Sequence, residues 1–411
     1  MELTNRRLLI VEEALKNHTG HWYEYDRAVS QFNRDAGVDV TIAAHQTIDP
    51  EISQELNAIS LFARTNWDGI YYSPTAWKRY LGILQHNWYV YRTLEQFLAA
   101  SQGYDCIFVP TVIIYHWIAW IGLLQKFHGH KFQRLVLFIR NNAGSYPNGT
   151  TQPVFQRHTL LLKKVLKSYQ KWIDAGVVCL GTDSHRHATE YKLLAGIEVQ
   201  VFPHPKVQVP EWNHSDPAKR FSNSPVLFSC LGPARLEKGV DILQAAILHL
   251  FKVQPDLNAK FIIQWNLEIL QEDGSVLARS PELEQSDQVL FLTSNLSSEE
   301  YDTYLSQSDC IILPYRRQAY YTRLSGIAIE AAMSGIPLIY TEDTWLEDAV
   351  AQYGAGLGVA NEDYLSLAEA INLMARNIEQ YLAHAKEKAP LARAYHSSER
   401  FLRCLWGEAA E

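Results

Sequence analysis

The sequence is poor in cysteine and contains neither an internal repeat nor a low-complexity segment. Its 411 residues include only five cysteines, an odd number, spread far apart and mostly within apolar runs: Cys106, Cys179, Cys230, Cys310 and Cys404. This usage argues against a disulfide framework or a cysteine-ligated metal site and is typical of reduced thiols in a cytoplasmic protein. We expect no secretory leader, because Arg6-Arg7 leads into the short run LLIV and then into two glutamates.

Acidic residues are missing from one long stretch of an otherwise acidic chain. The formal net charge is −8, yet no Asp or Glu occurs between Asp105 and Asp174, where nine Lys and Arg residues lie. A basic region inside an acidic protein predicts an anionic partner for that region alone. The stretch has no recognised nucleic-acid-binding motif, so residues 106–173 favour an anionic membrane surface or a phosphate-bearing acceptor.

Residues 106–125 lack any formal charge, and 20 such positions are long enough to cross a bilayer. Pro110 divides this run, and Thr111, His116 and Gln125 would need polar partners inside a membrane. We therefore expect a buried strand followed by a helix, with a membrane span as the alternative.

Short β-branched runs alternate with longer helical patterns along most of the chain. Strands are expected at 6–13, 38–44, 104–110, 134–140, 176–182 and 199–204, and again at 225–232, 260–265, 288–294, 309–314 and 336–341. Continuous apolar strands separated by helices are typical of parallel sheets covered on both faces. A polar stretch at 205–224 separates the two series. The pattern predicts an α/β protein with two Rossmann-like doubly wound domains, residues 1–208 and 222–390, and a terminal helix in 391–411 that packs back across the boundary.

The segment GPARLEKGVD (232–241) has the chemistry of a diphosphate site. Arg235 and Lys238 flank the start of a helix directly after an apolar strand. Two cations and the amides of a helix start suit a pair of phosphates. A solvated cation pair on a helix end is the simpler alternative.

A second segment, SGIAIEAAMSG (325–335), has the chemistry of a nucleotide site. Ser325 is suited to cap a helix, and Gly326 lets a ligand approach the backbone at its first position. Glu330 lies in an otherwise apolar setting, where a carboxylate needs a partner such as a ribose diol. The alternative is a charge on the helix surface.

These two segments, about 90 residues apart, resemble the carboxyl-terminal domain of glycosyltransferase family 4, which comprises retaining nucleotide-sugar enzymes of the GT-B fold. Residues 348–371 resemble the closing segment of that domain, and the similarity covers about 221–375, whereas the amino-terminal half matches only in strand order. The resemblance implies two Rossmann-like domains that face a central cleft. The glycines of 354–358 do not form a dinucleotide loop in this interpretation, because they precede a strand and do not open a helix.

The resemblance implies a role for each matching residue. The donor diphosphate would contact Gly20, Arg235, Lys238, Ser325, Gly326 and Ile327. Glu330 would hold the ribose, Leu296 would contact the base, and Thr322 and Arg323 would lie at the donor sugar. His116, Arg235 and Lys238 would be the catalytic residues.

The sequence departs from the family pattern at three points. Thr322 occupies the place of the first glutamate in the usual Glu-x7-Glu pair, which leaves the identity of the donor sugar open. Arg235 is three residues before Lys238, where five is the common spacing. The functional histidine of the amino-terminal domain has no unambiguous counterpart: His116 is nearest, His21 and Arg140 are alternatives, and a lone histidine in YHWIAW is commonly a core residue.

Residues 156–172 are expected to form one basic amphipathic helix. Leu161, Val165, Tyr169 and Trp172 fall on a single helical stripe with four lysines around it. Such a helix suits an anionic membrane and a saccharide or lipid-diphosphate-linked acceptor, although an ordinary surface helix is the alternative.

The sequence therefore predicts a retaining hexosyltransferase that uses a UDP-sugar, with UDP-glucose as the best candidate, to extend a bacterial polysaccharide or glycolipid. No cofactor and no metal are expected, because cations and amides stabilise the leaving diphosphate and no Asp-x-Asp motif occurs. The protein would be cytoplasmic or peripheral on the inner membrane face. The alternative is a non-catalytic nucleotide-binding scaffold, which Thr322 keeps open. An NAD-dependent oxidoreductase is disfavoured because no strand–GxGxxG–helix unit is present.

Overall fold

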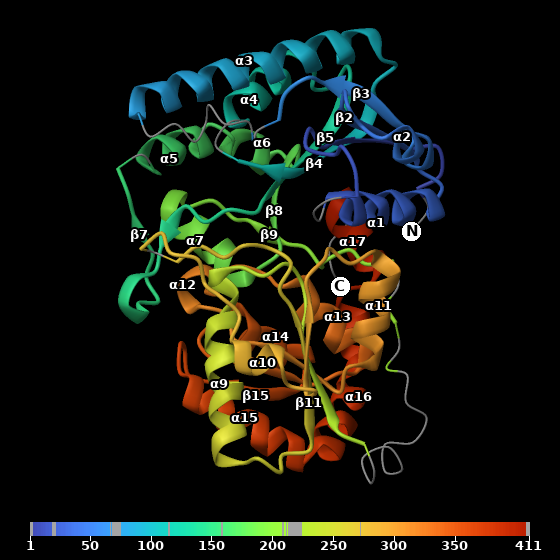
Figure 1. Cartoon of the computed structure of the whole chain (residues 1–411). Coiled ribbons are helices and arrows are strands. Elements are labelled where there is room, and N and C mark those ends of the chain that lie inside the picture. The colour runs from blue at the N-terminus through green and yellow to red at the C-terminus, as the bar shows by residue number, and fades with distance from the viewer. Residues whose placement is uncertain are drawn as a thin grey trace. The chain divides into compact units, whose positions relative to one another are not determined.

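The computed structural model describes residues 3–18, 22–65, 67, 75–113, 116–157, 159–207, 209–210, 212, 224–271 and 273–407, apart from the side chains of Ala76 and Asn148. The chain divides into two compact α/β units (Figure 1). Unit 1 comprises Met1–Tyr146, Thr150–Val207 and His396–Glu411, and unit 2 comprises Pro147–Gly149 and Gln208–Tyr395.

Unit 1 is built on a seven-stranded sheet whose strands are all parallel, in the order β3-β2-β1-β4-β5-β8-β9. The strands are β1 (Arg7–Val11), β2 (Asp39–His45), β3 (Ala58–Phe62), β4 (Tyr104–Val112), β5 (Phe132–Ile139), β8 (Val178–Thr182) and β9 (Gln200–Val201). This confirms the predicted parallel sheet. The prediction missed β3, a five-residue edge strand, and β9 is shorter than the run predicted at 199–204.

Helices cover both faces of this sheet, as parallel sheets require. One face carries α3 (Ala76–Ala100), α4 (Trp117–Phe127), α5 (Thr159–Lys167), α6 (Gln170–Asp174) and α7 (His185–Ala195). The other carries α1 (Trp22–Asp35), α2 (Pro50–Leu56) and the terminal helix α17 (Ser398–Trp406). The indole Nε1 of Trp406 donates to Asn33 Oδ1 at 2.9 Å, which ties α17 to α1. The short strands β6 (Gly144–Ser145) and β7 (Val154–Phe155) form a separate hairpin with the 3-10 turn η2 (Pro147–Gly149) between them.

The uncharged run at 106–125 is a strand and a helix, β4 and α4, as predicted. Within the part of the chain that the structure describes, no helix has both the length and the apolar character needed to cross a bilayer. The prediction of one continuous helix over 156–172 is wrong, because the chain forms α5 and α6 with a break at Ser168. Tyr169 causes the break: its side chain turns into the core, and its hydroxyl donates to the carbonyl of Trp117.

Unit 2 has a six-stranded sheet of parallel strands in the order β12-β11-β10-β13-β14-β15. The strands are β10 (Val226–Cys230), β11 (Ala259–Gln264), β12 (Val289–Leu292), β13 (Cys310–Leu313), β14 (Leu338–Thr341) and β15 (Gly356–Val359). The helices are η3 (Leu236–Lys238), α9 (Val240–Val253), α10 (Pro281–Glu284), α11 (Ser298–Gln307), α12 (Arg317–Tyr320), α13 (Gly326–Ser334), α14 (Trp345–Tyr353), α15 (Tyr364–Arg376) and α16 (Ile378–Tyr395).

The glycine run at 354–358 lies largely inside β15 and does not precede it. A Cβ at Gly356 would stand 2.0 Å from the carbonyl oxygen of Leu338 on β14, so only glycine fits this close strand pair. The run therefore serves strand packing, in keeping with the rejection of a dinucleotide loop. All five cysteines are buried free thiols, as expected.

Candidate functional sites

Each sheet has a point where the strand order reverses, between β1 and β4 in unit 1 and between β10 and β13 in unit 2. Open α/β sheets bind ligands outside the carboxyl ends of the strands at such a point. Most of the site residues that the sequence predicted lie in the loops that follow these four strands.

In unit 2, the loop after β10 brings cations to the carboxyl edge of the sheet. Arg235 caps η3 and its guanidinium lies 3.8 Å from Glu237, while Arg323, beyond β13, reaches the same carboxylate at 4.0 Å. Lys238 Nζ lies close over Gly232, where an added Cβ would stand 2.7 Å away. Arg235 and Arg323 thus share a single carboxylate, and Lys238 lies close enough to feel the charge of all three groups, which leaves a net positive charge.

Lys238 is the least hydrated of these cations. Its burial, reinforced by the nearby positive charges of Arg235 and Arg323, lowers the pKa of Lys238 to about 8. The ammonium lies 5.9 Å from the ring centroid of Tyr315, the residue two positions after β13. A desolvated ammonium is a strong site for an anion. The cation has already lost most of its water on folding, so anion binding does not have to remove it.

The start of α13 contributes backbone donors at the same edge. Ser325 occupies the N-cap position, but its side chain makes no capping hydrogen bond. The first amides of a helix have no partner within the helix, so those of Gly326 and Ile327 point outward at its positive end. The predicted diphosphate residues of unit 2 therefore gather from two loops at one switch point.

Glu330 is buried on α13 and has a partner within the chain. The hydroxyl of Tyr301 on α11 donates to Glu330 Oε2 at 2.5 Å. Burial and the adjacent carboxylate raise the pKa of Tyr301 well above its usual value, which keeps the hydroxyl protonated as a donor. The hydrogen bond thus holds the carboxylate of Glu330 in one orientation. Because Tyr301 is a partner within the chain, the burial of Glu330 alone does not indicate a bound ribose.

A polar bridge connects the segment of Leu296 to the cationic loop. Asn266, after β11, accepts from the amide of Ala234 at 3.2 Å and donates to Asn295 Oδ1 at 2.6 Å. Leu296 is half-buried against the core beside this bridge. Thr322, by contrast, is completely buried.

Arg316 supports the cationic loop, a role that the sequence did not suggest. Its guanidinium pairs with Asp241 at 2.6 Å and with Glu362 at 2.8 Å, and also donates to the carbonyl of Leu236 in η3. Two carboxylates neutralise this arginine, so it positions the loop and adds no free positive charge to that of Arg235, Lys238 and Arg323.

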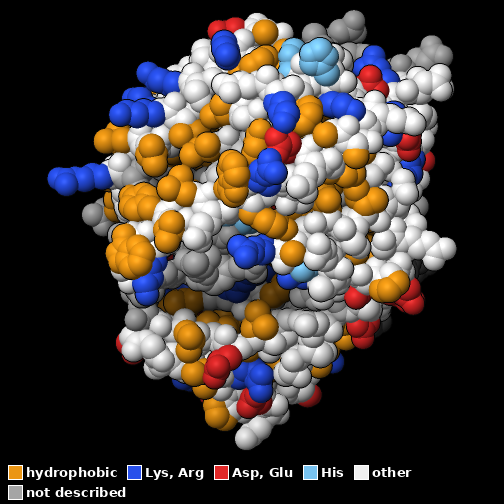
Figure 2. Space-filling model, turned by 90° about the horizontal axis from the view of Figure 1, so that it is seen from above, with side chains coloured by type: hydrophobic (Ala, Val, Ile, Leu, Met, Phe, Trp, Pro, Cys, Tyr) orange, Lys and Arg blue, Asp and Glu red, His pale blue; other side chains and the backbone are white. Residues whose placement is uncertain are grey.

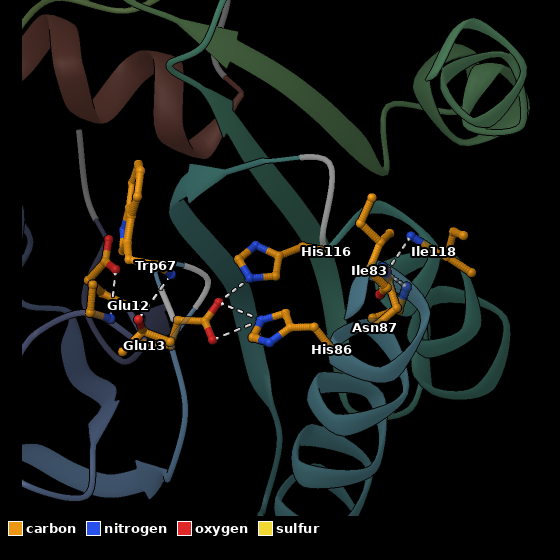
Figure 3. Close-up of polar contacts among 11 residues, drawn as sticks. Glu12, Glu13, Trp67, Ile83, His86, Asn87, His116 and Ile118 are labelled. Carbon is orange, nitrogen blue, oxygen red and sulfur yellow. Dashed lines mark hydrogen bonds and ion pairs between the residues drawn. The ribbon is translucent and has the colours of Figure 1, made fainter. Parts of the chain in front are cut away.

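In unit 1, His116 belongs to a buried cluster that the sequence did not reveal. Glu13, just after β1, lies between His116, at the start of α4, and His86 on α3 (Figure 3). His86 Nε2 lies 3.1–3.2 Å from the two carboxylate oxygens, and His116 Nε2 makes a short hydrogen bond to Glu13 Oε1. All three side chains are almost inaccessible to solvent.

Glu13 is ionised despite its burial. Burial opposes ionisation, but the charge and hydrogen bond of His116 and the hydrogen bond of His86 outweigh it and lower the pKa of Glu13 to about 2. An ionised carboxylate only accepts hydrogen bonds, so Nε2 of each imidazole carries a proton. Within the described residues, Nδ1 of His116 has no hydrogen-bond partner.

Asn87, next to His86 on α3, fixes the helix that follows His116. Its Oδ1 accepts from the amides of Ile118 and Ala119, each at 3.0 Å, and so satisfies the start of α4 (Figure 3). Two adjacent residues of α3 therefore help to hold His116 in place. His86 does so through their shared partner Glu13, and Asn87 does so through the start of α4.

Glu13, His86 and His116 are also ligand types that bind transition metals, and their ligand atoms lie within 4.8 Å of one another. A metal-bound histidine almost always donates its second ring nitrogen to an acceptor. Because Nδ1 of His116 lacks such an acceptor among the described residues, the cluster fits a hydrogen-bonded relay better than a metal centre.

Two further buried acids lie at this edge, Glu12 after β1 and Asp26 on α1. Burial and the negative charge of Glu13 raise the pKa of Glu12 to about 7, and burial and Glu12 raise the pKa of Asp26 well above its usual value. Neither oxygen of Asp26 finds a hydrogen-bond partner in the described part of the chain. Both carboxyl groups therefore keep their protons to a higher pH than exposed carboxyl groups do.

The alternatives to His116 differ in where they lie. Arg140, after β5, donates to the carbonyl of Pro110 at 2.9 Å and lies 4.2 Å from the ring centroid of Tyr25, so it braces the strand ends. Gly20 and His21 lie outside the described residues.

A cavity of about 790 Å³ in unit 1 lies between α7, β9 and α17, and none of the predicted site residues lines it.

Residues 225–377 match the family model for glycosyl transferases group 1, and no curated protein matches the chain. Several solved structures share its fold. Sucrose-phosphate synthase from Thermosynechococcus elongatus is 17% identical with a TM-score of 0.65, over 97% of this chain and 96% of that one. Anabaena HepE in complex with UDP-glucose is 13% identical with a TM-score of 0.58, over 97% and 98%. The calicheamicin glycosyltransferase CalG4 is 16% identical with a TM-score of 0.53, over 99% of each chain.

At such identities the structural likeness establishes the fold, and the family match establishes a similarity in unit 2. The matched range includes the cationic loop after β10 and the start of α13, where the predicted donor residues gather. The chain therefore has the GT-B fold, and its resemblance to glycosyl transferases group 1 over residues 225–377 supports a glycosyltransferase.

Proposed function

We propose that the protein is a retaining glycosyltransferase that moves a hexosyl group from a UDP-sugar, with UDP-glucose as the best candidate, to a saccharide or lipid-diphosphate-linked acceptor. The observation that carries the proposal is the group of cations at the switch point of unit 2, where Arg235 and Arg323 pair with Glu237 and Lys238 lies nearby. Such an excess of positive charge beside a helix start suits a diphosphate.

In this proposal the diphosphate lies between the cationic loop and the amides of Gly326 and Ile327. The ribose hydroxyls bind Glu330, which Tyr301 keeps in place, and the base packs against Leu296. Arg323 lies toward the donor sugar, and Thr322 lies beside it in the chain but is completely buried. The Anabaena protein HepE is a structural neighbour described with UDP-glucose, which supports the choice of donor.

The reaction breaks the bond between the anomeric carbon and the diphosphate oxygen, and the electron pair leaves with UDP. The acceptor oxygen forms the new bond to the same carbon, and its proton passes to the leaving phosphate. Negative charge therefore develops on the diphosphate, and Arg235, Lys238 and the α13 amides stabilise it. These groups supply the positive charge that a divalent ion provides elsewhere, so we expect donor cleavage to withstand a chelator.

His116 would act from unit 1. Glu13 holds its Nε2–H, which leaves Nδ1 to hydrogen-bond a hydroxyl of the donor sugar or the acceptor. The proposed product is a bacterial polysaccharide or glycolipid, made on the cytoplasmic side of the membrane, as the resemblance of the sequence to glycosyltransferase family 4 suggests.

A thermal-shift panel with UDP, GDP, ADP and their glucose conjugates tests the donor, because a ligand that binds only the folded state raises the melting temperature. We expect a shift with UDP and UDP-glucose alone. Donor hydrolysis should then be measurable in the wild type and lost in Lys238→Ala. No shift with any nucleotide would favour the scaffold, and a shift without hydrolysis or transfer would favour a nucleotide-binding protein without catalysis.

Proton uptake provides a second test of the site itself. At pH 8 about half of the Lys238 side chains are deprotonated, because the pKa is about 8. A bound diphosphate would restore the ammonium, so calorimetry in buffers of different ionisation enthalpy should show uptake of about half a proton on UDP binding. Lys238→Met should abolish this uptake, whereas uptake that persists would place the diphosphate elsewhere.

A further inference from the structure

The helical layer α3–α5 of unit 1 carries an unusual number of exposed hydrophobic side chains. Eight of the twenty large hydrophobic residues that are exposed in the described part of the chain lie on these three helices. Five of them are on α3, namely Trp77, Tyr80, Leu81, Leu84 and Trp88, with Trp77 62% and Trp88 65% exposed. Scattered single hydrophobic residues are ordinary on a protein surface, but a cluster of this kind marks an interaction site.

The exposed residues of α3 form one stripe along the helix. They recur every three or four positions from Trp77 to Trp88, which places them on a single helical face. A second side of α3 carries Val90, Leu94 and Leu98 and packs against the core of unit 1. The helix is thus apolar on two sides, and the core covers only one of them.

Positive charge lines this stripe. The helices α3, α4 and α5 contain seven Lys and Arg residues and a single acid, Glu95. Glu95 is itself neutralised by Arg92 at 2.5 Å and Lys126 at 2.6 Å. In Figure 2, viewed onto this layer, hydrophobic side chains are interspersed with Lys and Arg, with few acidic side chains among them.

Cations accompany both exposed indoles. Lys78 Nζ lies 5.8 Å from the ring centroid of Trp77, and the guanidinium of Arg92 lies 5.8 Å from that of Trp88. Indoles beside Lys and Arg are typical of the headgroup region of a bilayer, where the ring is half-buried and the cation meets lipid phosphate.

We propose that this outer surface of α3–α5 docks on an anionic bilayer, with Trp77, Leu81, Leu84 and Trp88 inserted at the headgroup level and Lys78, Arg79 and Arg92 on lipid phosphates. A second copy of the chain is disfavoured as occupant, because two surfaces of the same strong positive charge repel each other. Protein interfaces are also depleted in lysine, which is abundant here.

This surface overlaps the one that the sequence predicted over 106–173 in α4 and α5, but its apolar stripe lies outside that range. Two cations of the predicted stretch, Lys131 just before β5 and Arg134 within it, bond to backbone carbonyls. In the predicted stripe of 156–172 only Leu161 is exposed, since Val165, Tyr169 and Trp172 pack against the core. The exposed stripe lies on α3, outside the predicted range.

Sedimentation of the full chain with vesicles tests the docking surface, and it needs no nucleotide, so its outcome is independent of the proposed glycosyl transfer. One set of vesicles is an equimolar mixture of phosphatidylglycerol and phosphatidylcholine, and the other is phosphatidylcholine alone. We expect binding at least about tenfold tighter to the anionic set, weakened by salt. Equal binding to both sets, or none to either, would overturn the proposal.

Paired variants separate the contribution of positive charge to vesicle binding from that of the inserted tryptophans. Lys78→Glu with Arg79→Glu should weaken anionic binding at least about tenfold, and Trp77→Ser with Trp88→Ser should do the same at high salt. The matched controls are Lys252→Glu with Lys260→Glu for charge, and Tyr364→Ser with Leu365→Ser for exposed apolar area, all on unit 2. Melting temperatures should stay unchanged in every variant, because the altered side chains are exposed.

The depth of insertion gives an independent readout. Brominated lipid should quench part of the tryptophan fluorescence of the wild type on anionic vesicles, and Trp77→Phe with Trp88→Phe should bind but lose that quenching. If quenching is unchanged in this variant, other residues insert and the proposed surface is wrong. A dimer in sedimentation velocity that the charge-reversed pair disrupts, with no vesicle binding, would identify a second copy as the occupant.

Discussion

At the carboxyl edge of its sheet, unit 2 gathers cations that remain partly exposed, whereas unit 1 gathers carboxylates and imidazoles that are almost wholly buried. The strand topology of the two sites is alike, with a parallel sheet whose order reverses between its first and fourth strands in one unit and between β10 and β13 in the other. The side chains placed on this common frame differ completely.

The difference shows how one architecture serves two tasks. An exposed cation can exchange water for a phosphate, so the residues after β10 suit binding and stabilisation of a leaving diphosphate. A buried carboxylate between two imidazoles has no room for a large anion, but it fixes the orientation of one imidazole nitrogen. In the proposed function, unit 2 neutralises the charge of the diphosphate and unit 1 positions His116, and variants in either unit test this division.

The largest effect is expected for Lys238→Ala. Losing a preorganised cation at a developing anion should lower kcat for donor cleavage by about 10²- to 10³-fold. The matched control is Lys252→Ala, an exposed lysine in the last turn of α9, which should leave kcat unchanged. Steady-state kinetics with saturating UDP-glucose measure both. Near-normal kcat in Lys238→Ala would remove the cationic loop from the mechanism.

The next comparison is His116→Gln against His86→Gln. Each change removes one Nε2–H bond to the buried Glu13, so each should lower the free energy of unfolding by about 1–3 kcal/mol. Only His116 contacts the substrate in our proposal, so only its variant should lose turnover, by about 10²-fold. Chemical denaturation and kinetics on the same samples separate stability from catalysis. Similar turnover in both variants would mean that the cluster is purely structural.

Glu12 makes the stability of unit 1 depend on pH. Its folded pKa of about 7 lies above the reference value of 4.5, so the folded state holds an extra proton between these pH values. The stabilisation is complete below the reference pKa and is lost as pH rises through 7, with a magnitude on the order of 2 kcal/mol.

Glu12→Gln keeps a neutral side chain at every pH. Its free energy of unfolding should therefore change less between about pH 5 and pH 8 than that of the wild type. Denaturant titration at about five pH values across this range measures the slope. If the wild type and Glu12→Gln have parallel profiles, another group governs the dependence.

The smallest effect concerns the nucleotide ribose. If Glu330 accepts from the ribose diol, the wild type should bind UDP about tenfold more tightly than 2′-deoxy-UDP, and Glu330→Gln should lose most of that preference. Tyr301→Phe removes the internal bond to Glu330 and leaves its charge, so it should retain the preference. Calorimetric titration with both nucleotides gives the ratio. An unchanged ratio in Glu330→Gln would limit Glu330 to its bond with Tyr301.

The sequence predicted most of unit 2 for local reasons. Apolar runs of β-branched residues identify buried strands, and the chain between Gly232 and Asp241 is short enough that Arg235 and Lys238 must lie at one strand end. The sequence also identified Ser325 as the residue before a helix, although its side chain does not cap. What it missed was the partner of Glu330, because Tyr301 is 29 positions away on another helix.

Unit 1 was less predictable because its site is made from distant segments. Glu13 meets His86 across 73 positions and His116 across 103, and no local pattern links them. The sequence did not show which side of α3 faces solvent either. Residues such as Trp77 and Leu84 are of the same type and spacing as those of a helix stripe that packs in a core. Tyr169 is the opposite case. The sequence placed it on the apolar face of a surface helix, but its side chain is buried and its hydroxyl donates to the carbonyl of Trp117.

The sequence by itself determined the alternation of strands and helices, the parallel character of both sheets and the cationic loop after β10, because these follow from residue period and spacing along a short piece of chain. Only the tertiary structure decided which histidine meets Glu13, which acids hold protons and which apolar stripe stays exposed. These properties depend on desolvation and on contacts between segments far apart in the chain, and both arise only when the elements have packed.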